Sequence, residues 1–446
     1  MIGKHALIIG GGMAGLVTAR VLSDFFETVT LIERDTYPDT PAWRNGVPQE
    51  RHVHTLLAKG RELLEDLYPG IDAEFESLGA PLYTWGNDTH VLTTGGQVGK
   101  VKTDVYGRGL SRTLLEYVVR CRTHGIANIQ FYPNTEVKKL IIEHHAVIGC
   151  TVENRETGET KSIKADLIVD ASGRYSKTGD WLAEAGYPAP AESLVDPKMG
   201  YATRWYQLPD DIELEIPAVL IQPGIIPDLY RGAAAAVLEN RQVVITLAGM
   251  NADYPPTDEV AFLEYARSLP DSTVVSWIQT LTPVSPIAGF RAVNRLRHYG
   301  RAKHYPDRFI AIGDAVCALD PIYGQGMTVA LLHVYALKTL LKKSSTLDGF
   351  ANRFHRKLSR VNLVPWLMAA SEDRRYPLTE GDKPTWFDNL AHLYIVQLFL
   401  ATPHDPFVAR TLLRVLHMLQ HPLYLVHPRV LWGILRVWVK RLLKKI

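Results

Sequence analysis

Cysteine is scarce in this chain, because only Cys121, Cys150 and Cys317 occur among its 446 residues. They are widely spaced and form no Cys-x-x-Cys pair, which excludes a disulfide framework and a cysteine-based zinc site. This usage is typical of a reducing, cytoplasmic setting. No other cluster has metal-ligand spacing, since His52 and His54 lack further ligands nearby, and we interpret these two as flavin-site or packing residues. The sequence therefore predicts no metal.

Long apolar runs and a strong charge of one sign are also missing. No run approaches the roughly 18 residues of a membrane-spanning helix. The first strand and glycine turn begin so early that no secretory signal is expected. The 49 Lys and Arg residues nearly balance the 47 Asp and Glu residues, so no overall field favours nucleic acid as a partner.

Acidic residues are absent from the end of the chain. None follows Asp405, whereas eight Lys or Arg residues do. On a helix starting at Pro428, apolar and basic residues fall on opposite faces, which is typical of helices that lie in the surface of an anionic bilayer. The same apolar face can equally pack on the protein body, and the sequence leaves both readings of 428–446 open. The apolar residues are Leu431, Ile434, Leu435, Trp438 and Leu442, and the basic ones are Arg429, Arg436, Lys440 and Lys444.

The beginning of the chain carries a dinucleotide-binding fingerprint. A buried strand, a glycine turn, a helix and a second buried strand are predicted over residues 5–9, 10–15, 16–26 and 28–32. The turn reads Gly10-Gly-Gly12-Met-Ala-Gly15, in the context that the fingerprint requires. Gly10 permits the tight turn, Gly12 lets the backbone approach a pyrophosphate, and Gly15 lets the helix pack closely on the strand.

The residues around this turn complete the predicted nucleotide site. Glu33 ends the second strand, where its carboxylate can bind ribose hydroxyls, and this argues against a 2′-phosphate. The phosphates are expected at the helix N-terminus, beside Met13 and Ala14. Arg34 follows Glu33 and belongs to the same predicted set.

A second motif over 308–327 lies roughly 300 residues after the first. There an apolar run ends in Asp314, which can accept a hydrogen bond from a sugar-alcohol hydroxyl, and a Pro/Gly-rich turn opens a helix. Gly324 and Gly326 let the backbone approach a flat ring. The amides of Gly326 and Met327 face the negative charge of a reduced flavin. Two distant motifs predict one extended cofactor held at both ends, and FAD has that shape.

The remaining pattern predicts an α/β protein with a Rossmann-like FAD-binding domain, an inserted β-rich substrate domain and a C-terminal helical region. Strands are expected at 202–208, 218–221 and 233–247, and helices at 53–67 and beyond 341. The predicted FAD-binding domain comprises 1–75, 101–195 and 291–345, the substrate domain 76–100 and 196–290, and the helical region 346–446.

Three blocks in this order resemble the FAD-dependent monooxygenases of the aromatic-hydroxylase fold: 10–33, Asp170-Ala-Ser-Gly173 and 313–326. Within that family the chain is most similar to a bacterial epoxidase-like and hydroxylase-like branch. The resemblance implies that Arg112 contacts the cofactor and that Val137 meets its adenine end through the backbone. It identifies no catalytic side chain. The stretches most similar to that branch are 46–57, 110–116, 173–178 and 371–377.

The resemblance implies oxygen transfer from O2, through a flavin C4a-hydroperoxide, to a large hydrophobic substrate. An olefin needs no deprotonation, whereas a phenol benefits from a base, and no base is evident. We therefore expect epoxidation or hydroxylation of a polyene, terpenoid or polyketide. Trp205, Tyr206 and Tyr323 are candidates for the substrate pocket.

The electron donor is expected to be NAD(P)H, either directly or through a separate flavin reductase. The chain has Ser172-Gly173 and Gly179 where related hydroxylases carry an Asp-Gly pair and an Arg tied to NAD(P)H use. Two other functions remain open: an FAD-dependent reductase or dehydrogenase of isoprenoid double bonds, and a non-catalytic, flavin-bearing protein at a membrane. Halogenation is disfavoured because the Trp-x-Trp-x-Ile-Pro signature is absent.

Overall fold

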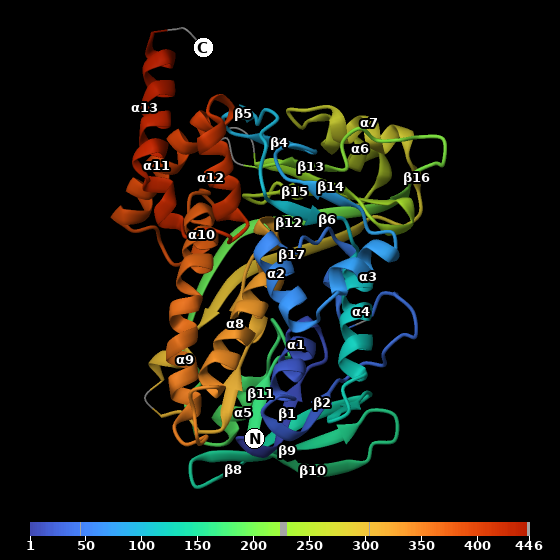
Figure 1. Cartoon of the computed structure of the whole chain (residues 1–446), viewed down its shortest axis with the longest axis vertical. Coiled ribbons are helices and arrows are strands. Elements are labelled where there is room, and N and C mark those ends of the chain that lie inside the picture. The colour runs from blue at the N-terminus through green and yellow to red at the C-terminus, as the bar shows by residue number, and fades with distance from the viewer. Residues whose placement is uncertain (45, 224–229, 303, 444–446) are drawn as a thin grey trace.

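The computed structural model describes residues 1–44, 46–223, 230–302 and 304–443. Figure 1 shows an elongated molecule with a parallel sheet at one end, a larger sheet at the other, and the last helices beside the larger sheet. This arrangement confirms the predicted α/β class with a Rossmann-like core.

The first sheet has five parallel strands in the order β18-β11-β1-β2-β7. The last four residues of β1 and of β2 are all buried, because layers cover both faces of this sheet. Its strands are β1 Gly3–Ile9, β2 Phe26–Ile32, β7 Ile129–Tyr132, β11 Leu167–Asp170 and β18 Phe309–Ala311.

Helices cover one face of the parallel sheet and an antiparallel meander covers the other. The meander β8-β9-β10 packs on β1 and β2 through a small apolar cluster. The helical layer forms the main core. Its helices are α1 Met13–Leu22, α2 Ala58–Leu67, α3 Ile71–Ser77, α4 Arg112–His124, α8 Gly326–Leu341 and α9 Phe350–Val361, and the meander is β8 Thr135–Glu143, β9 Ala146–Asn154 and β10 Thr160–Lys164, with α5 Thr178–Glu184 beside it.

The second sheet has ten strands and is centred on the long strand β12. Helices α6 and α7 cover one of its faces. Its strands are β4 Thr89–Thr93, β5 Gly96–Gln97, β12 Glu192–Gln207, β13 Ala218–Ile221, β14 Arg231–Val237, β15 Gln242–Gly249, β16 Thr282–Pro283, β17 Ala288–Arg297, β19 Cys317–Ala318 and β20 Glu380–Gly381; the two helices are α6 Glu259–Arg267 and α7 Thr273–Thr280, and β3 Leu82–Thr84 and β6 Tyr106–Arg108 form a separate pair.

The C-terminal region is helical, with a small apolar core of its own. Helix α13 packs through Val430, Gly433 and Val437, and a side chain at Gly433 would lie 2.7 Å from Val408. In Figure 1 this helix projects beyond the rest of the molecule. Within the described ranges, no helix is both long and apolar enough to cross a membrane. The helices are α10 Leu363–Asp373, α11 Trp386–Ala401, α12 Pro406–Leu416 and α13 Pro428–Leu442.

Two elements differ from the sequence-based expectation. The strand predicted over 233–247 is the hairpin β14–β15, because Asn240 adopts a left-handed conformation with φ 55° in the turn between them. The helix predicted from residue 53 begins at Ala58. A 3-10 turn over Pro48–Arg51 and an extended segment precede it, and both contribute to the cavity described next.

Candidate cofactor and active site

One cavity brings together both glycine motifs, although they are far apart in the sequence. The turn after β1, the end of β2, the start of α4, strand β8 and the start of α8 all contribute to its wall. Gly15 lies behind this wall, on the first turn of α1. The predicted cofactor residues that line the cavity are Gly10, Gly12, Met13, Ala14, Glu33, Arg34, Arg112, Val137, Asp314, Gly324, Gly326 and Met327.

Glycine is needed at each of the three fingerprint positions for a different physical reason. Gly10 has φ +101°, and a side chain there would lie 2.7 Å from the carbonyl oxygen of Ala171. A side chain at Gly15 would lie 1.9 Å from the carbonyl oxygen of Gly10, so only glycine allows α1 to pack this closely. A side chain at Gly12 would meet nothing nearer than 4.0 Å and would occupy the cavity instead. Gly10 and Gly15 thus serve the fold, whereas Gly12 keeps the cavity open.

Two helix N-termini face this cavity. Helix α1 starts after Gly12 and α8 after Gln325, and no side chain caps either helix. The first N–H groups of a helix lack intrahelical acceptors and carry partial positive charge. Both walls can therefore bind negatively charged or hydrogen-bond-accepting groups.

Glu33 is held at the end of β2 by backbone amides. Its Oε2 accepts a hydrogen bond from the Gly11 amide at 2.7 Å, and its Oε1 accepts one from the Asp35 amide at 2.9 Å. These contacts tie the ends of β1 and β2 together and keep the carboxylate beside the cavity, as the nucleotide-binding prediction requires.

A buried charge cluster near α4 was not anticipated in full. Arg44 and Arg112 both donate to Glu116, the latter at 2.6 Å, and all three side chains are at most 5% exposed. Arg44 Nη1 and Nε and Arg112 Nη1 are buried and find no hydrogen-bond partner among the described residues. Arg44 Nη1 is also 3.6 Å from Glu33 Oε2, which is an ion pair but too long for a hydrogen bond. Buried N–H groups rarely lack a hydrogen bond, so these three nitrogens fit a ligand with negatively charged oxygens, such as the pyrophosphate of a dinucleotide.

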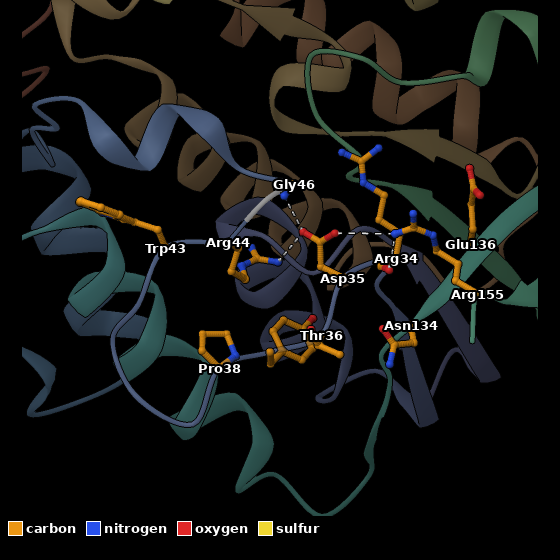
Figure 2. Close-up of a pocket in the computed structure, with 11 residues that line it drawn as sticks. Arg34, Asp35, Thr36, Pro38, Trp43, Arg44, Gly46, Asn134, Glu136 and Arg155 are labelled. Carbon is orange, nitrogen blue, oxygen red and sulfur yellow. Dashed lines mark hydrogen bonds and ion pairs between the residues drawn. The ribbon is translucent and has the colours of Figure 1, made fainter. Parts of the chain in front are cut away.

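A second pocket, of about 590 Å³, adjoins the cavity beyond the end of β2. The two share Arg34, Asp35, Arg44, Gly46 and Glu136. Figure 2 shows Asp35 between the two arginines Arg44 and Arg155. Its carboxylate accepts a hydrogen bond from the Gly46 amide at 2.9 Å and lies 3.9 Å from Arg44 and 4.0 Å from Arg155. The cavity therefore continues into a polar pocket at this end.

The Asp314 turn is held by α8. The Gly313 amide donates to His333 Nδ1 at 3.0 Å, and burial lowers the pKa of His333 to about 4, so the ring is neutral and can accept. A side chain at Gly313 would lie 2.9 Å from Ala14, which brings the two motifs into contact. Burial raises the pKa of Asp314, while Arg174 and Arg112 oppose this effect.

An aromatic wall on the side of the large sheet was missed by the sequence analysis. Tyr201 of β12, Phe290 of β17 and His52 line the cavity there, with ring centroids 5.3 Å apart for His52 and Phe290. Burial, with a smaller effect of Arg51, lowers the pKa of His52 to about 4. Burial likewise lowers the pKa of His54, another lining residue, to about 3. Both rings are neutral at pH 7.

His52 and His54 were considered as metal ligands because of their spacing. The described part of the chain contains no group of three or more His, Cys, Asp or Glu residues arranged to hold a metal ion. His52 Nδ1 lies 2.8 Å from Thr203 Oγ1, and His54 Nδ1 lies 2.9 Å from the carbonyl oxygen of His52. Both histidines thus belong to the wall of the cavity.

The three predicted substrate residues are not among those that line the cavity. Trp205 donates through Nε1 to the carbonyl oxygen of Arg51 at 2.8 Å, and Tyr206 is buried beneath α6 and α7. Tyr323 donates to Asp373 at 3.0 Å. Side chains alternate along a strand, so Trp205 shares a face of β12 with Tyr201, which stands two repeats earlier and lines the cavity. That alternation is the signal that points to Tyr201.

The comparisons with known proteins agree with this geometry. The sequence model of the FAD binding domain family matches residues 56–200. Protein Rv3254 of Mycobacterium tuberculosis is 32% identical over 98% of this chain and 95% of that protein. Squalene monooxygenase of Mus musculus is 25% identical, over 80% of this chain but only 58% of that enzyme.

Solved structures support the same fold. p-Nitrophenol 4-monooxygenase PnpA of Pseudomonas putida superposes with a TM-score of 0.66 over 92% of this chain and 96% of that one, at 14% identity. The long alignment with Protein Rv3254 places the two chains in one family, and the chain belongs to the FAD-dependent monooxygenases.

Proposed function

We propose that this enzyme binds FAD along the cavity and inserts one oxygen atom of O2 into a large hydrophobic substrate. The proposal rests on the shared cavity, which is lined by two uncapped helix N-termini and by Arg44 and Arg112, whose buried guanidinium groups keep nitrogens without a hydrogen bond. An extended anionic dinucleotide satisfies these groups at once.

We assign one part of FAD to each region of the cavity. Glu33, Arg34 and Val137 would hold the adenosine, with the pocket of Figure 2 beside them. Gly12, Met13, Ala14, Arg44 and Arg112 would hold the pyrophosphate. Asp314, Gly324, Gly326 and Met327 would hold the ribityl chain and the ring, with Gly15 supporting the turn from behind.

When bound, FAD supplies the redox chemistry that activates O2. The chain's own contribution is to orient the two reactants and to exclude water. The N-terminus of α8 stabilises negative charge on the cofactor side, and the neutral rings of His52, Tyr201 and Phe290 form a wall without fixed charge on the other. No side chain is assigned as the catalytic acid or base.

The wall favours an apolar substrate that needs no deprotonation. His52 in the wall and His54 in the same cavity are both neutral at pH 7, because burial lowers their pKa values to about 4 and about 3. This supports epoxidation of an olefin, or hydroxylation, in a polyene, terpenoid or polyketide. The relation to squalene monooxygenase supports the same substrate class.

Isotopically labelled O2 tests the proposal. Purified protein with FAD and a hydrophobic lipid extract would be supplied with NADH or NADPH, each with and without a flavin reductase. The expected result is one labelled oxygen atom in the product. A reduced or desaturated product without label would favour the alternative reductase or dehydrogenase, and no turnover with any donor would favour the non-catalytic flavoprotein.

The same experiment, run with each electron donor, also tests how electrons reach the flavin. Asp170 accepts hydrogen bonds from the side chains of Ser172, Ser176 and Thr178, which orders the loop where relatives carry residues tied to NAD(P)H use. We propose NAD(P)H as the ultimate donor. Turnover that depends on the added flavin reductase would identify the reductase as a partner.

We also propose peripheral contact with the cytoplasmic surface of an anionic membrane. Helix α13 packs on the body through Val430 and Val437, whereas Leu435 and Trp438 on the predicted apolar face are 46% and 48% exposed. Trp432 beside them is 63% exposed. This arrangement supports the membrane reading over simple packing of the apolar face. Lys444 and Lys445 lie outside the described residues.

Liposome flotation tests this contact. Trp438→Ser with Leu442→Ser changes exposed residues only, so folding should be unaffected and binding to phosphatidylglycerol vesicles should fall at least tenfold. Val260→Ser on α6, at a residue that is 72% exposed, is the matched control. Equal binding of both variants would refute the membrane role.

The predicted domain division is kept as a proposal. All strands of the parallel sheet fall within 1–75, 101–195 and 291–345. Strands β4, β5 and β13 to β16 fall within 76–100 and 196–290, and α9 to α13 within 346–446. Strands β12 and β17 run across the proposed boundaries, so two continuous strands join the units.

A further inference from the structure

A third pocket lies beside the C-terminal helices, apart from the cofactor cavity. Its volume is about 560 Å³, within the roughly 300–1,000 Å³ of small-molecule sites. Helix α12, the loop of residues 102–104 and the segment of residues 420–427 form its walls, and none of its lining residues also lines the cavity. The pocket is therefore separate from the proposed oxygenase site.

The loop before β6 is fixed against α12. Val101 and Val105 of this loop are buried in one apolar cluster with Leu413 of the helix. Asp104, between them, accepts a hydrogen bond from Arg414 of the same helix. Apolar packing and an ion pair thus hold two of the walls together, so the pocket is formed without a ligand.

Basic side chains dominate the pocket. Lys102, Arg410 and Arg414 line it, and Asp104 is the only acid among its lining residues. The hydrogen bond from Arg414, together with the charge of Arg410, lowers the pKa of Asp104, so this acid is ionised and neutralises one of the three bases. Within the described ranges, neither Lys102 nor Arg410 has a carboxylate at ion-pair distance. Two positive charges are therefore left for an anion.

His427 adds a hydrogen-bond donor to these charges. It caps α13, because its Nδ1 accepts a hydrogen bond from the Arg429 amide at 3.2 Å. The hydrogen of the neutral ring is then on Nε2, which makes this lining side chain a donor. Cationic groups and N–H donors together suit the oxygens of a phosphate group.

The turn that borders the pocket is apolar and exposed. Leu423, Tyr424 and Val426 in the 3-10 turn Pro422–Val426 are 70%, 49% and 50% exposed, and Tyr424 also lines the pocket. This turn packs against α12 and α13, which lie side by side in Figure 1. A free inorganic anion gains nothing from such a border, whereas a lipid can place its acyl chains on it.

We propose that this pocket binds the headgroup of an anionic phospholipid, with the phosphate near Lys102, Arg410 and His427 and the acyl chains over the turn Pro422–Val426. The inference rests on the membrane contact proposed above for α13 and deepens it. Because the turn and α13 are in contact, both can meet one bilayer surface. The pocket then makes membrane binding depend on the charge of the headgroup.

Calorimetry with a short-chain phosphatidylglycerol, kept below its micelle concentration, tests the site without a bilayer. We expect saturable binding to the wild type, with both short-chain phosphatidylcholine and inorganic phosphate at least tenfold weaker. Arg410→Gln should weaken phosphatidylglycerol binding about fivefold, the effect of one basic residue at an anionic lipid surface. Arg356→Gln on α9 is the matched control, since this arginine is also exposed.

Three calorimetric results would overturn the proposal: no binding of phosphatidylglycerol to the wild type, equal affinity in the two variants, or equal affinity for inorganic phosphate. The last result would identify a free anion as the ligand.

Vesicle flotation separates this site from the apolar contact of α13. Lys102→Gln with Arg410→Gln, both at exposed positions, should weaken binding to phosphatidylglycerol vesicles about 25-fold and leave binding to phosphatidylcholine vesicles unchanged. An equal loss with both lipids would contradict headgroup recognition. If Trp438→Ser with Leu442→Ser floats like the wild type while calorimetry shows the lipid bound, the proposed contact of α13 fails and the headgroup site stands.

Discussion

The two sides of the cavity differ in how they treat charge. The side formed by α1 and α4 concentrates charge, because Arg44, Arg112 and Glu116 are buried together and three of the guanidinium nitrogens make no hydrogen bond. On the side of the large sheet the wall consists of uncharged rings, namely Tyr201, Phe290 and a neutral His52. This difference supports our proposal that one side binds an anionic cofactor and the other accepts an apolar molecule.

Filling the space beside α1 should have the largest effect. Gly12→Val adds a side chain that meets no protein atom within 4 Å except Glu116, so the fold should remain and FAD affinity should fall on the order of 100-fold or more. Gly99→Val is the control, since a side chain there also meets nothing within 4 Å. Titration of each apoprotein with FAD, followed by flavin fluorescence, measures the FAD affinity of both variants. Unchanged affinity in Gly12→Val would place the pyrophosphate elsewhere.

Neutralising the charged side should have the next largest effect. Arg112→Gln removes a buried charged donor, which is worth about 1.5–3 kcal/mol, so FAD affinity should fall about 10- to 100-fold. Arg122→Gln on the same helix removes a partly exposed ion pair with Glu74 and should change FAD affinity little. If the two variants bind FAD equally, the guanidinium group of Arg112 has no role in cofactor binding.

Trimming the aromatic side should separate substrate binding from cofactor binding. Phe290→Ala should leave FAD affinity unchanged and raise KM for an apolar substrate about tenfold, because lost apolar contacts cost about 1–3 kcal/mol. Phe407→Ala on α12, where Phe407 packs on His427 away from the cavity, is a control for a half-buried ring. A loss of FAD affinity in Phe290→Ala would show that the two sides are not distinct.

The smallest expected effect is on stability at acid pH. Burial lowers the folded-state pKa of His52 to about 4, below its unfolded value, so the unfolded chain binds the proton first as the pH falls. His52 therefore destabilises the fold progressively from about pH 6.5 down to about pH 4, and His52→Gln should lose that part of the decline. The difference between the thermal melting points at pH 7 and pH 4.5, compared for wild type and His52→Gln, measures this decline in stability. An identical decline in both proteins would contradict the burial argument.

The cofactor side was largely predictable from the sequence, because backbone requirements leave local marks. Gly10, Gly12 and Gly15 report a tight turn and close approach, and Asp314 marks the end of a buried strand. The substrate side was not, because its wall is assembled by strand pairing across distant segments. Phe290 reaches Tyr201 through register in an antiparallel sheet, and no local pattern encodes that pairing.

Two buried acids, Asp320 and Asp373, show the same limit. They are 53 positions apart, and both reach Asn294 only because α10 packs beside the turn before α8. Each residue alone reads as an ordinary acid near a turn or a helix end. Only packing shows that both are fully buried and share Asn294.

The central claim is that one FAD molecule spans both motifs. Calorimetric titration of wild type, Gly12→Val and Gly326→Val with FAD, ADP and riboflavin tests this claim most directly. A side chain at Gly326 would lie 3.7 Å from Asp314 Oδ1, an ordinary contact distance, so the fold should tolerate it. We expect one FAD per wild-type chain, weaker ADP binding only in Gly12→Val, weaker riboflavin binding only in Gly326→Val, and weaker FAD binding in both. Full FAD affinity in either variant would contradict the account.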